Sequence, residues 1–267
     1  MKKYLTVFKI SFAQEFAYPI NLIFWRIRNI FQIILLYFLW SSVFENTSGE
    51  IFGYSKEKIL TYIFGIIVLK AFVFSTKTND IAGDISRGDL VNYLLKPISY
   101  FKYWFSRDIA SKSLNLVFSF FEITILFLVL KPQVYIQKDL LDLCIFLFFL
   151  LLAVFLFFLI LMLTNLITFW APEAGWSSQF LIIIILSEFF SGAVFPIDIL
   201  PQFLQRYIYL TPFPYLIFIP LQVYLGKVET LVLYKSILVS FFWIGILIIL
   251  LKLMWQKGLK RFEGAGR

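Results

Sequence analysis

The stretch CIFLFFLLLAVFLFFLILML, residues 144–163, decides the fold class of this chain. Every residue in it is apolar, and a helix of about 20 such residues is long enough to cross the hydrocarbon core of a bilayer. A strand of a transmembrane barrel would alternate between apolar and polar residues over roughly ten positions. The stretch does not alternate, and it therefore predicts a transmembrane helix.

The whole chain has the composition of a membrane protein. Of its 267 residues, 61% are hydrophobic and 15% are charged, against about 25% charged in soluble domains. Apolar runs predict six transmembrane helices at about 22–44, 58–76, 113–130, 142–168, 179–197 and 233–255. We expect an all-α, polytopic membrane protein with a single transmembrane domain, 1–267.

The positive charges flank the apolar runs instead of forming one basic face. The net charge is +8, but this distribution sets membrane topology and argues against nucleic acid as a partner. Stretches 1–28, 77–112 and 252–267 carry sixteen lysines and arginines, and the stretches predicted on the other side carry seven. Basic residues gather on the cytoplasmic side, so both termini are predicted in the cytoplasm.

The chain lacks the residues of most catalytic and metal sites. It has no histidine, which excludes zinc-protease motifs and histidine acid–base chemistry. Its one cysteine, Cys144, excludes an intrachain disulfide and is expected to be a small buried apolar residue. No GxxxxGK[ST] phosphate-binding loop occurs. We expect no enzyme activity, cofactor or metal in this chain.

The first 17 residues predict an amphipathic helix at the membrane surface. Leu5, Phe8, Phe12 and Phe16 fall on one helical face.

The segment 77–112 is the most polar part of the chain. Asp89 is expected to cap a short helix that ends at Lys96, because Pro97 restricts the residue before it. Gly88 permits a sharp turn into this helix.

One interpretation is a helix that lies on lipid, and the other is a docking helix for a cytoplasmic partner. Mixed charges favour docking, and the predicted docking residues are Asp84, Arg87, Gly88, Asp89, Leu90, Leu94, Lys96 and Pro97. Leu90 and Leu94 are expected on one apolar face.

The segment 191–227 is too apolar for an ordinary loop and too interrupted for a membrane span. Its interruptions and turns include Gly192, Pro196, Pro201, Pro212, Pro214 and Gly226. Irregular backbone at membrane depth must be buried in protein or line a cavity. We expect an outer re-entrant hairpin that closes a pathway; an amphipathic loop on the outer leaflet is the alternative.

Two carboxylates fall inside predicted spans. Glu122 and Glu188 would be costly in hydrocarbon, by roughly 2.5–3.5 kcal/mol, and should face protein or water. They either line a pathway that binds a cationic or polar substrate, or they bond to neighbouring helices, one of them to Lys70.

Three stretches together resemble a known family. DISRGDLVNYLLKPISY (84–100), FSGAVFPIDILPQFLQRYIYLTPFPYLIFIPLQVYLGK (190–227) and WQKGLKRFEGAGR (255–267) are similar, in order, to motifs of type-2 ABC exporter permeases. The likeness covers nearly the whole chain, although the family often ends in Gly-Gly and this chain ends in Gly-Arg.

The resemblance implies a permease subunit of an ATP-driven exporter in a prokaryotic plasma membrane. A second permease, identical or homologous, would complete the pathway, and separate cytoplasmic ABC ATPase subunits would bind ATP and magnesium. The segment 83–97 would be the coupling helix, residues 1–17 the interface helix, and 170–179 a smaller contact. A proton-coupled secondary carrier that uses Glu122 and Glu188 is the alternative. Nothing in the sequence distinguishes the substrate.

Overall fold

The protein is a bundle of helices. The computed structural model describes residues 2–17, 19–45 and 49–262, which contain helices and no β-strand. The all-α prediction is therefore confirmed. Met1 and residues 263–267, at the ends that we predict in the cytoplasm, lie outside the described residues. The α-helices are α1 (Lys2–Gln14), α2 (Pro19–Val43), α3 (Lys56–Leu69), α4 (Asp80–Ser86), α5 (Val91–Leu94), α6 (Tyr100–Leu130), α7 (Leu140–Leu166), α8 (Gly175–Phe180), α9 (Glu188–Phe190), α10 (Gln202–Tyr209), α11 (Phe218–Tyr224) and α12 (Thr230–Arg261).

Four helical stretches in the described residues are long and apolar enough to cross a membrane. They are Tyr100–Leu130, Leu140–Phe169, Pro172–Phe190 and Thr230–Arg261. Helix α2 and the helical run Lys56–Phe74 lie beside them, but both carry charged side chains that reduce their apolar character. The count of six spans remains a prediction.

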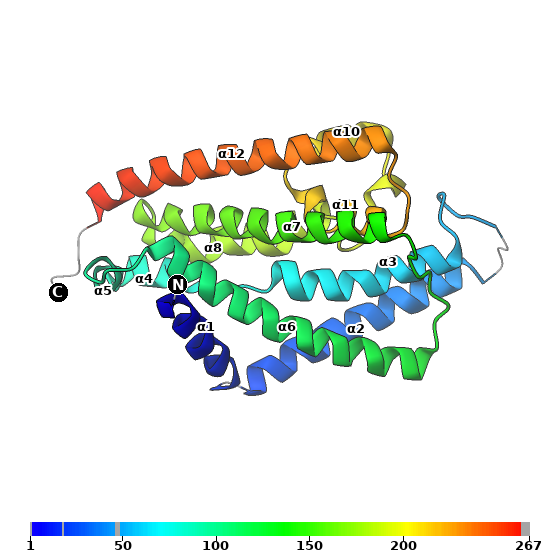
Figure 1. Ribbon diagram of the computed structural model, residues 1–267, viewed down its shortest axis with the longest axis horizontal. Coiled ribbons are helices and arrows are strands. Elements are labelled where there is room, and N and C mark those ends of the chain that lie inside the picture. Colours follow the sequence, from blue (N-terminus) through cyan, green and yellow to red (C-terminus); the bar gives the residue numbers. More distant parts are fainter. Residues whose placement is uncertain (1, 18, 46–48, 263–267) are drawn as a thin grey trace.

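The long helices run along the longest axis of the molecule and separate its two ends (Figure 1). Helices α4 and α5 and the end of α12 lie at one end, which we call the α5 end. Helix α10, the start of α12 and the connection between α2 and α3 lie toward the other, which we call the α10 end.

Helix α7 forms the centre of the bundle. Its side chains from Phe149 to Leu166 are mostly buried, among them Phe149, Leu156 and Phe157. Large apolar side chains on the outer helices are exposed instead, such as Phe31 on α2, Phe120 on α6 and Leu238 on α12. A surface of this kind is suited to lipid contact.

Some sequence predictions require correction. Helix α6 runs without a break from Tyr100 to Leu130, so the helical part of the segment 77–112 that begins after Ser99 and the third predicted span, 113–130, form one helix. The fifth predicted span, 179–197, runs too far, because the helical stretch ends at Phe190. Cys144 is exposed on α7 and not buried.

Two π-helical turns interrupt the regular helices. The first, η2 (Lys70–Phe74), continues α3, and the second, η5 (Leu181–Ser187), joins α8 to α9. Such wide turns are frequent at functional sites in proteins. Here the two π-helical turns lie near each other, because the side chain of Lys70, at the start of η2, contacts that of Glu188, directly after η5.

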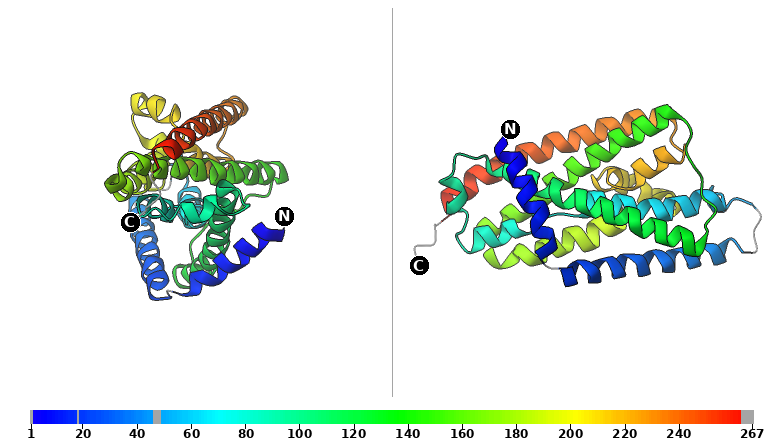
Figure 2. Two further views of the ribbon diagram at one scale, coloured as in Figure 1. Left: turned by 90° about the vertical axis from the view of Figure 1, so that its left-hand side faces the viewer. Right: turned by 60° about the horizontal axis from the view of Figure 1, so that its bottom comes forward.

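Helix α1 packs obliquely against α6. Figure 2 shows α1 and α2 diverging from their junction as the two arms of a V. Lys3 donates to the carbonyl of Pro97 at 2.6 Å, and Tyr4 Oη accepts from the Ser99 N–H at 3.1 Å. The predicted apolar face is only partly covered, because Leu5 and Phe16 are exposed while Phe8 and Phe12 are half-buried.

We expect Gly258→Ala to lower stability and Gly245→Ala to raise it, although both glycines lie on α12. A Cβ at Gly258 would overlap the buried Phe169 ring, whereas a Cβ at Gly245 would meet no atom within 4 Å. Overpacking costs typically 1–3 kcal/mol, and removing glycine from a helix gains roughly 0.5–1 kcal/mol. Thermal unfolding of the purified variants measures both effects; equal shifts in the two variants would contradict this packing.

Candidate functional site

A cavity of about 420 Å³ lies between α2, η2, α6 and η5. Its wall contains four basic side chains, two acidic ones and several amides and hydroxyls. The charged members are Glu15, Arg26, Arg28, Lys70, Lys77 and Glu188. We call this space the basic cavity.

Lys70 and Glu188 form an ion pair on the wall of the basic cavity. Lys70 Nζ lies 2.5 Å and 2.7 Å from the two carboxylate oxygens of Glu188, and it also donates to Gln32 at 3.2 Å. Lys70 begins η2 and Glu188 follows η5, so the pair joins the two π-helical turns. A bond from Lys70 to one of the two glutamates is among the alternatives predicted from the sequence, and the partner is Glu188.

Glu122 is bound by a second basic residue. Its Oε1 lies 3.2 Å from a guanidinium nitrogen of Arg26, which connects α6 with α2. The same guanidinium bonds to the Asn115 side chain and lies 5.2 Å from the centre of the Phe118 ring. Arg26 faces the cavity, whereas Glu122 stands behind it and does not belong to its wall.

A third pair lies where α1 ends. Lys77 Nζ lies 3.2 Å from Glu15 Oε2 and connects the segment after η2 with the turn between α1 and α2. The three pairs around the basic cavity therefore join chain segments that are distant in sequence.

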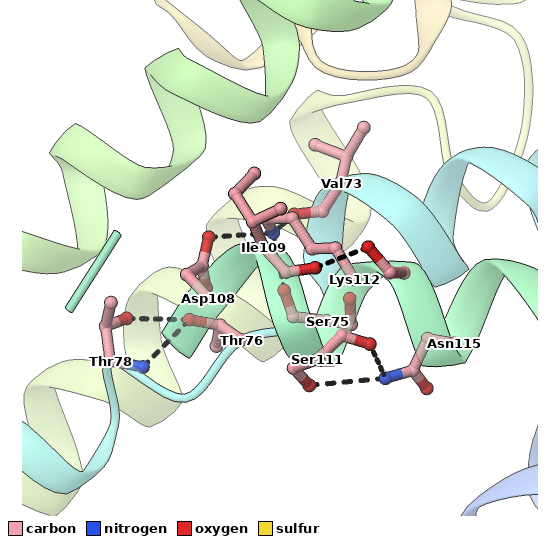
Figure 3. A network of polar contacts seen from close by, with 10 residues as sticks. Val73, Ser75, Thr76, Thr78, Asp108, Ile109, Ser111, Lys112 and Asn115 are labelled. Atoms are coloured by element: carbon pink, nitrogen blue, oxygen red, sulfur yellow. Dashed lines mark hydrogen bonds and ion pairs between the residues drawn. The ribbon is translucent and has the colours of Figure 1, made fainter. Parts of the chain in front are cut away.

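A fully buried ion pair lies beside the basic cavity, and the sequence analysis did not identify it. Asp108 and Lys112 are one helical turn apart on α6, with 3.3 Å between carboxylate and ammonium. Figure 3 shows Lys112 reaching the end of η2, where its Nζ donates to the carbonyls of Val73 at 2.7 Å and Ser75 at 2.5 Å. A side-chain cation can satisfy the terminal carbonyls of a helix in this way. The i,i+4 spacing of Asp and Lys was the available signal.

The same close-up contains polar groups of the cavity wall. Asn115 Nδ2 donates to the Ser111 carbonyl at 2.8 Å, and the Thr76 and Thr78 hydroxyls are 2.7 Å apart. Ser75, Thr76, Ser111 and Asn115 all line the basic cavity. The buried pair thus fixes the part of η2 and α6 from which the cavity is built.

The predicted docking helix is shorter than the sequence suggested. Helix α5 is a single turn, and Leu90, not Asp89, precedes it without a side-chain cap. The Asp89 carboxylate bonds to Arg87 Nε at 3.1 Å instead. Gly88 has φ of 81°, which confirms that a sharp turn is made there.

The two leucines that we expected on one apolar face point in different directions. Leu90 is fully buried within the chain's own core, while Leu94 is 46% and Leu95 is 81% exposed. The expectation that Leu90 forms part of an exposed face is therefore wrong. Lys96 is exposed with its Nζ 5.6 Å from the centre of the Tyr93 ring, and the carbonyl of Pro97 accepts from Lys3.

Asp84 on α4 is buried close to this segment. Its burial raises the pKa of the carboxyl to about 6, although nearby Arg107 acts in the opposite direction. The guanidinium of Arg107 lies 4.5 Å from the centre of the Trp104 ring. Asp84 therefore lies in the buried part of the docking segment and not on its exposed surface.

The segment 191–227 contains buried irregular backbone and one exposed helix. Residues 212–223 are buried and include Pro212, Pro214 and helix α11, whereas α10 carries exposed Phe203 and Tyr207. Pro201 directly precedes α10, and Pro196 directly precedes a 3₁₀ turn, Ile197–Ile199. That this segment enters the membrane is still a prediction.

Two glycines of this segment adopt left-handed backbone conformations. Gly192 has φ of 84° and Gly226 has φ of 62°. The Gly192 carbonyl accepts from Tyr62 Oη at 2.7 Å, and a Cβ at Gly192 would lie 2.6 Å from that hydroxyl oxygen. Gly192 is thus required by both its φ angle and its contact with α3.

Asp198 ties the segment to the rest of the α10 end. Tyr54 Oη donates to its carboxylate at 2.7 Å, and Lys227 Nζ lies 3.6 Å away. Burial and the Asp198 charge both raise the pKa of the Tyr54 hydroxyl. Asp198 is not among the residues predicted from the sequence, because one acid among prolines has no partner that the sequence reveals.

The described residues contain no grouping of three or more His, Cys, Asp or Glu side chains that could hold a metal ion.

Asp108→Asn should destabilise the protein strongly. It leaves Lys112 buried without its counter-charge, and breaking a buried pair costs roughly 3–5 kcal/mol. The double variant Asp108→Leu with Lys112→Met should be less damaging, because no buried charge remains. Thermal unfolding compares the two; a double variant less stable than the single one would contradict this account.

Asp84→Asn should stabilise the protein at pH 8 and have less effect near pH 4. The folded-state pKa of about 6 exceeds the unfolded value of about 3.9, so the folded state binds the proton more tightly. Wild-type stability then falls as pH rises from about 4 to about 6. Melting temperatures from pH 4 to pH 8 measure the effect, with the exposed Glu173→Gln as control; a pH-independent difference would refute it.

Comparison with known protein families gives one match. A family model described as ABC-2 family transporter protein matches residues 30–266. No curated protein matches the chain. The matched range includes α3 to α12 and most of α2, and hence every element that surrounds the basic cavity except the end of α1 and the start of α2.

Proposed function

Because the chain belongs to the ABC-2 family of transporter proteins, we propose that it is the membrane-spanning permease subunit of an ATP-driven exporter. The observation that carries this proposal is the family match over nearly the whole chain, together with the exposed leucines of α5 at one end of the helix bundle. In this proposal ATP and magnesium bind to separate ABC ATPase subunits, and this chain is not an enzyme.

We propose that the protein lies in the plasma membrane of a prokaryotic cell. Its α5 end and both termini are on the cytoplasmic side. The excess of lysine and arginine in 1–28, 77–112 and 252–267 supports this orientation. The ATPase then contacts the turn around α5, where Leu94 and Leu95 are the exposed apolar side chains. Residues 170–179 provide a second contact.

A second permease, identical or homologous, completes the pathway in this proposal. The basic cavity is the part of this chain that we assign to the pathway, because polar side chains of α2, η2, α6 and η5 meet there. The segment 191–227 closes its outer side, at the α10 end.

No observation favours the alternative of a proton-coupled secondary carrier. It requires Glu122 and Glu188 to exchange protons with a pathway, whereas each is bound to a basic side chain, Arg26 and Lys70 respectively.

We expect Leu94→Asp with Leu95→Asp to abolish binding of the ATPase. Burying a leucine contributes roughly 1.5–3 kcal/mol, so loss of both weakens binding by about a hundredfold or more. The measurement is co-purification with ABC ATPase subunits of the same organism, expressed together with this chain, and stimulation of their ATP hydrolysis.

The control introduces two aspartates elsewhere at the α5 end, with Gln256→Asp and Lys257→Asp on the exposed side of α12. Both variants must reach the membrane in equal amounts. Normal co-purification of the double leucine variant would contradict docking at α5, and absence of any ATPase binding by the wild-type chain would contradict the proposed function.

A further inference from the structure

Residues 87–97, which we call the docking turn, are attached to the helix bundle at few points. Most of their side chains are exposed, and Leu90 is the one that is fully buried. The Leu90 N–H donates to the carbonyl of Asp84 at 3.0 Å, which fixes the docking turn to α4. Tyr93 packs on α6, with its ring centre 5.5 Å from that of Tyr100. A segment with so few buried contacts opens at a low free energy while the rest of the bundle stays folded.

The side chain of Asp84 is buried at this attachment. It is 8% exposed, and its Oδ2 accepts no hydrogen bond from the residues that the structure describes. Arg107 of α6 acts on Asp84 electrostatically, but its guanidinium bonds to Asp80 at 3.5 Å and lies over the Trp104 ring. A buried carboxylate with an oxygen that accepts no hydrogen bond is costly, so this site favours the neutral acid.

The charged groups that are close to Asp84 in sequence do not cancel this effect. They are two acids and one base, Asp80, Asp89 and Arg87. Arg87 bonds to Asp89 at 3.1 Å, and the two acids oppose ionisation of Asp84. The hydroxyls of Tyr93 and Tyr100 also face it, but a phenol ionises only near about pH 10 and stays neutral here.

The elements that pack against α4 bring no further charge to Asp84. They are α7, α8 and the 3₁₀ turns Ile167–Phe169 and Pro172–Ala174. Their ionisable side chains are Asp142 and Cys144, near the start of α7 toward the α10 end (Figure 1), and the exposed Glu173. Burial therefore governs the ionisation of Asp84.

We propose that Asp84 is a pH-sensitive switch for the docking turn. While its carboxyl is neutral, the docking turn stays packed on α4 and α6. Once the carboxyl is ionised, the docking turn opens more often, because opening brings the carboxylate into water. The switch itself does not depend on the proposed function. In the proposed exporter, acidification of the cytoplasm holds the docking turn against the bundle and restricts its movement with the ATPase.

The pH range of the switch follows from the two pKa values of the carboxyl. Its pKa is about 6 in the folded protein and about 3.9 when exposed to water. Because the packed state binds the proton more tightly, packing of the docking turn weakens as pH rises from about 4 to about 6. Above about pH 7 the carboxyl is ionised in both states, and no further change is expected.

Hydrogen–deuterium exchange of the purified chain, without ATPase, measures how often the docking turn opens. Protection factors correct for the intrinsic pH dependence of exchange. We expect the amides of 88–96 to lose protection by about tenfold from pH 5 to pH 8, mostly below pH 7. The buried centre of α7 is the internal reference, and its amides should not follow this profile.

The test variant is Asp84→Asn, which keeps the size of the side chain and removes its titration. Its docking turn should show no loss of protection between pH 5 and pH 8. The control is Glu173→Gln, which removes an exposed carboxyl from an element that packs against α4 and should behave as the wild type does.

The possible outcomes are distinct. A loss of protection that is confined to the docking turn in the wild type and absent from Asp84→Asn supports the switch. The same loss in Asp84→Asn assigns the effect to another group, and a loss that extends to α7 shows that Asp84 acts on the whole fold; either result overturns the proposal, as does constant protection in the wild type. Because the ATPase is absent, these results are independent of the co-purification that tests the proposed function.

Discussion

A charged side chain inside a membrane-spanning bundle needs a partner, and the centre of this protein is arranged around that requirement. An unpaired charge at the centre of a membrane helix costs several kcal/mol, whereas a paired one can hold two helices in register. Lys70 with Glu188 and Arg26 with Glu122 each join two different helices. Arg26 and Lys70 both face the basic cavity, so the bases of the two pairs also form part of its polar wall.

The π-helical turn η2 connects the basic cavity to the α5 end. Lys70 begins η2, and the carbonyls of Val73 and Ser75 at its end are held by Lys112. The chain then passes Asn79, whose carbonyl accepts from Gln179 at 3.0 Å, and enters α4. A displacement at α4 and α5 would thus reach the cavity through a short, hydrogen-bonded segment. In the proposed exporter this segment is the direct route from the ATPase to the pathway.

The sequence allowed the fold class to be predicted because long apolar runs have few alternatives in water or lipid. It also marked Glu122 and Glu188 as unusual, since carboxylates are rare within apolar helices. Their partners were harder to identify. Arg26 was counted only for topology, and Asp108 and Lys112 were not predicted as a pair because both were assigned to the cytoplasmic segment 77–112. Leu90 and Leu94 were placed on one face of a longer helix, but a single turn after Gly88 directs Leu90 inward. Contacts of this kind depend on tertiary packing, which one sequence does not reveal.

The most direct test of the central claim is a double-mutant cycle on Lys70 and Glu188. The unfolding free energies of Lys70→Met, Glu188→Gln and the double variant are compared with that of the wild type. If the two side chains are partners within the bundle, each single change should destabilise, and the double change should cost less than the sum by about 0.5–3 kcal/mol. Additive effects would show that the two charges do not interact, and would contradict the account of the bundle as one organised by paired charges.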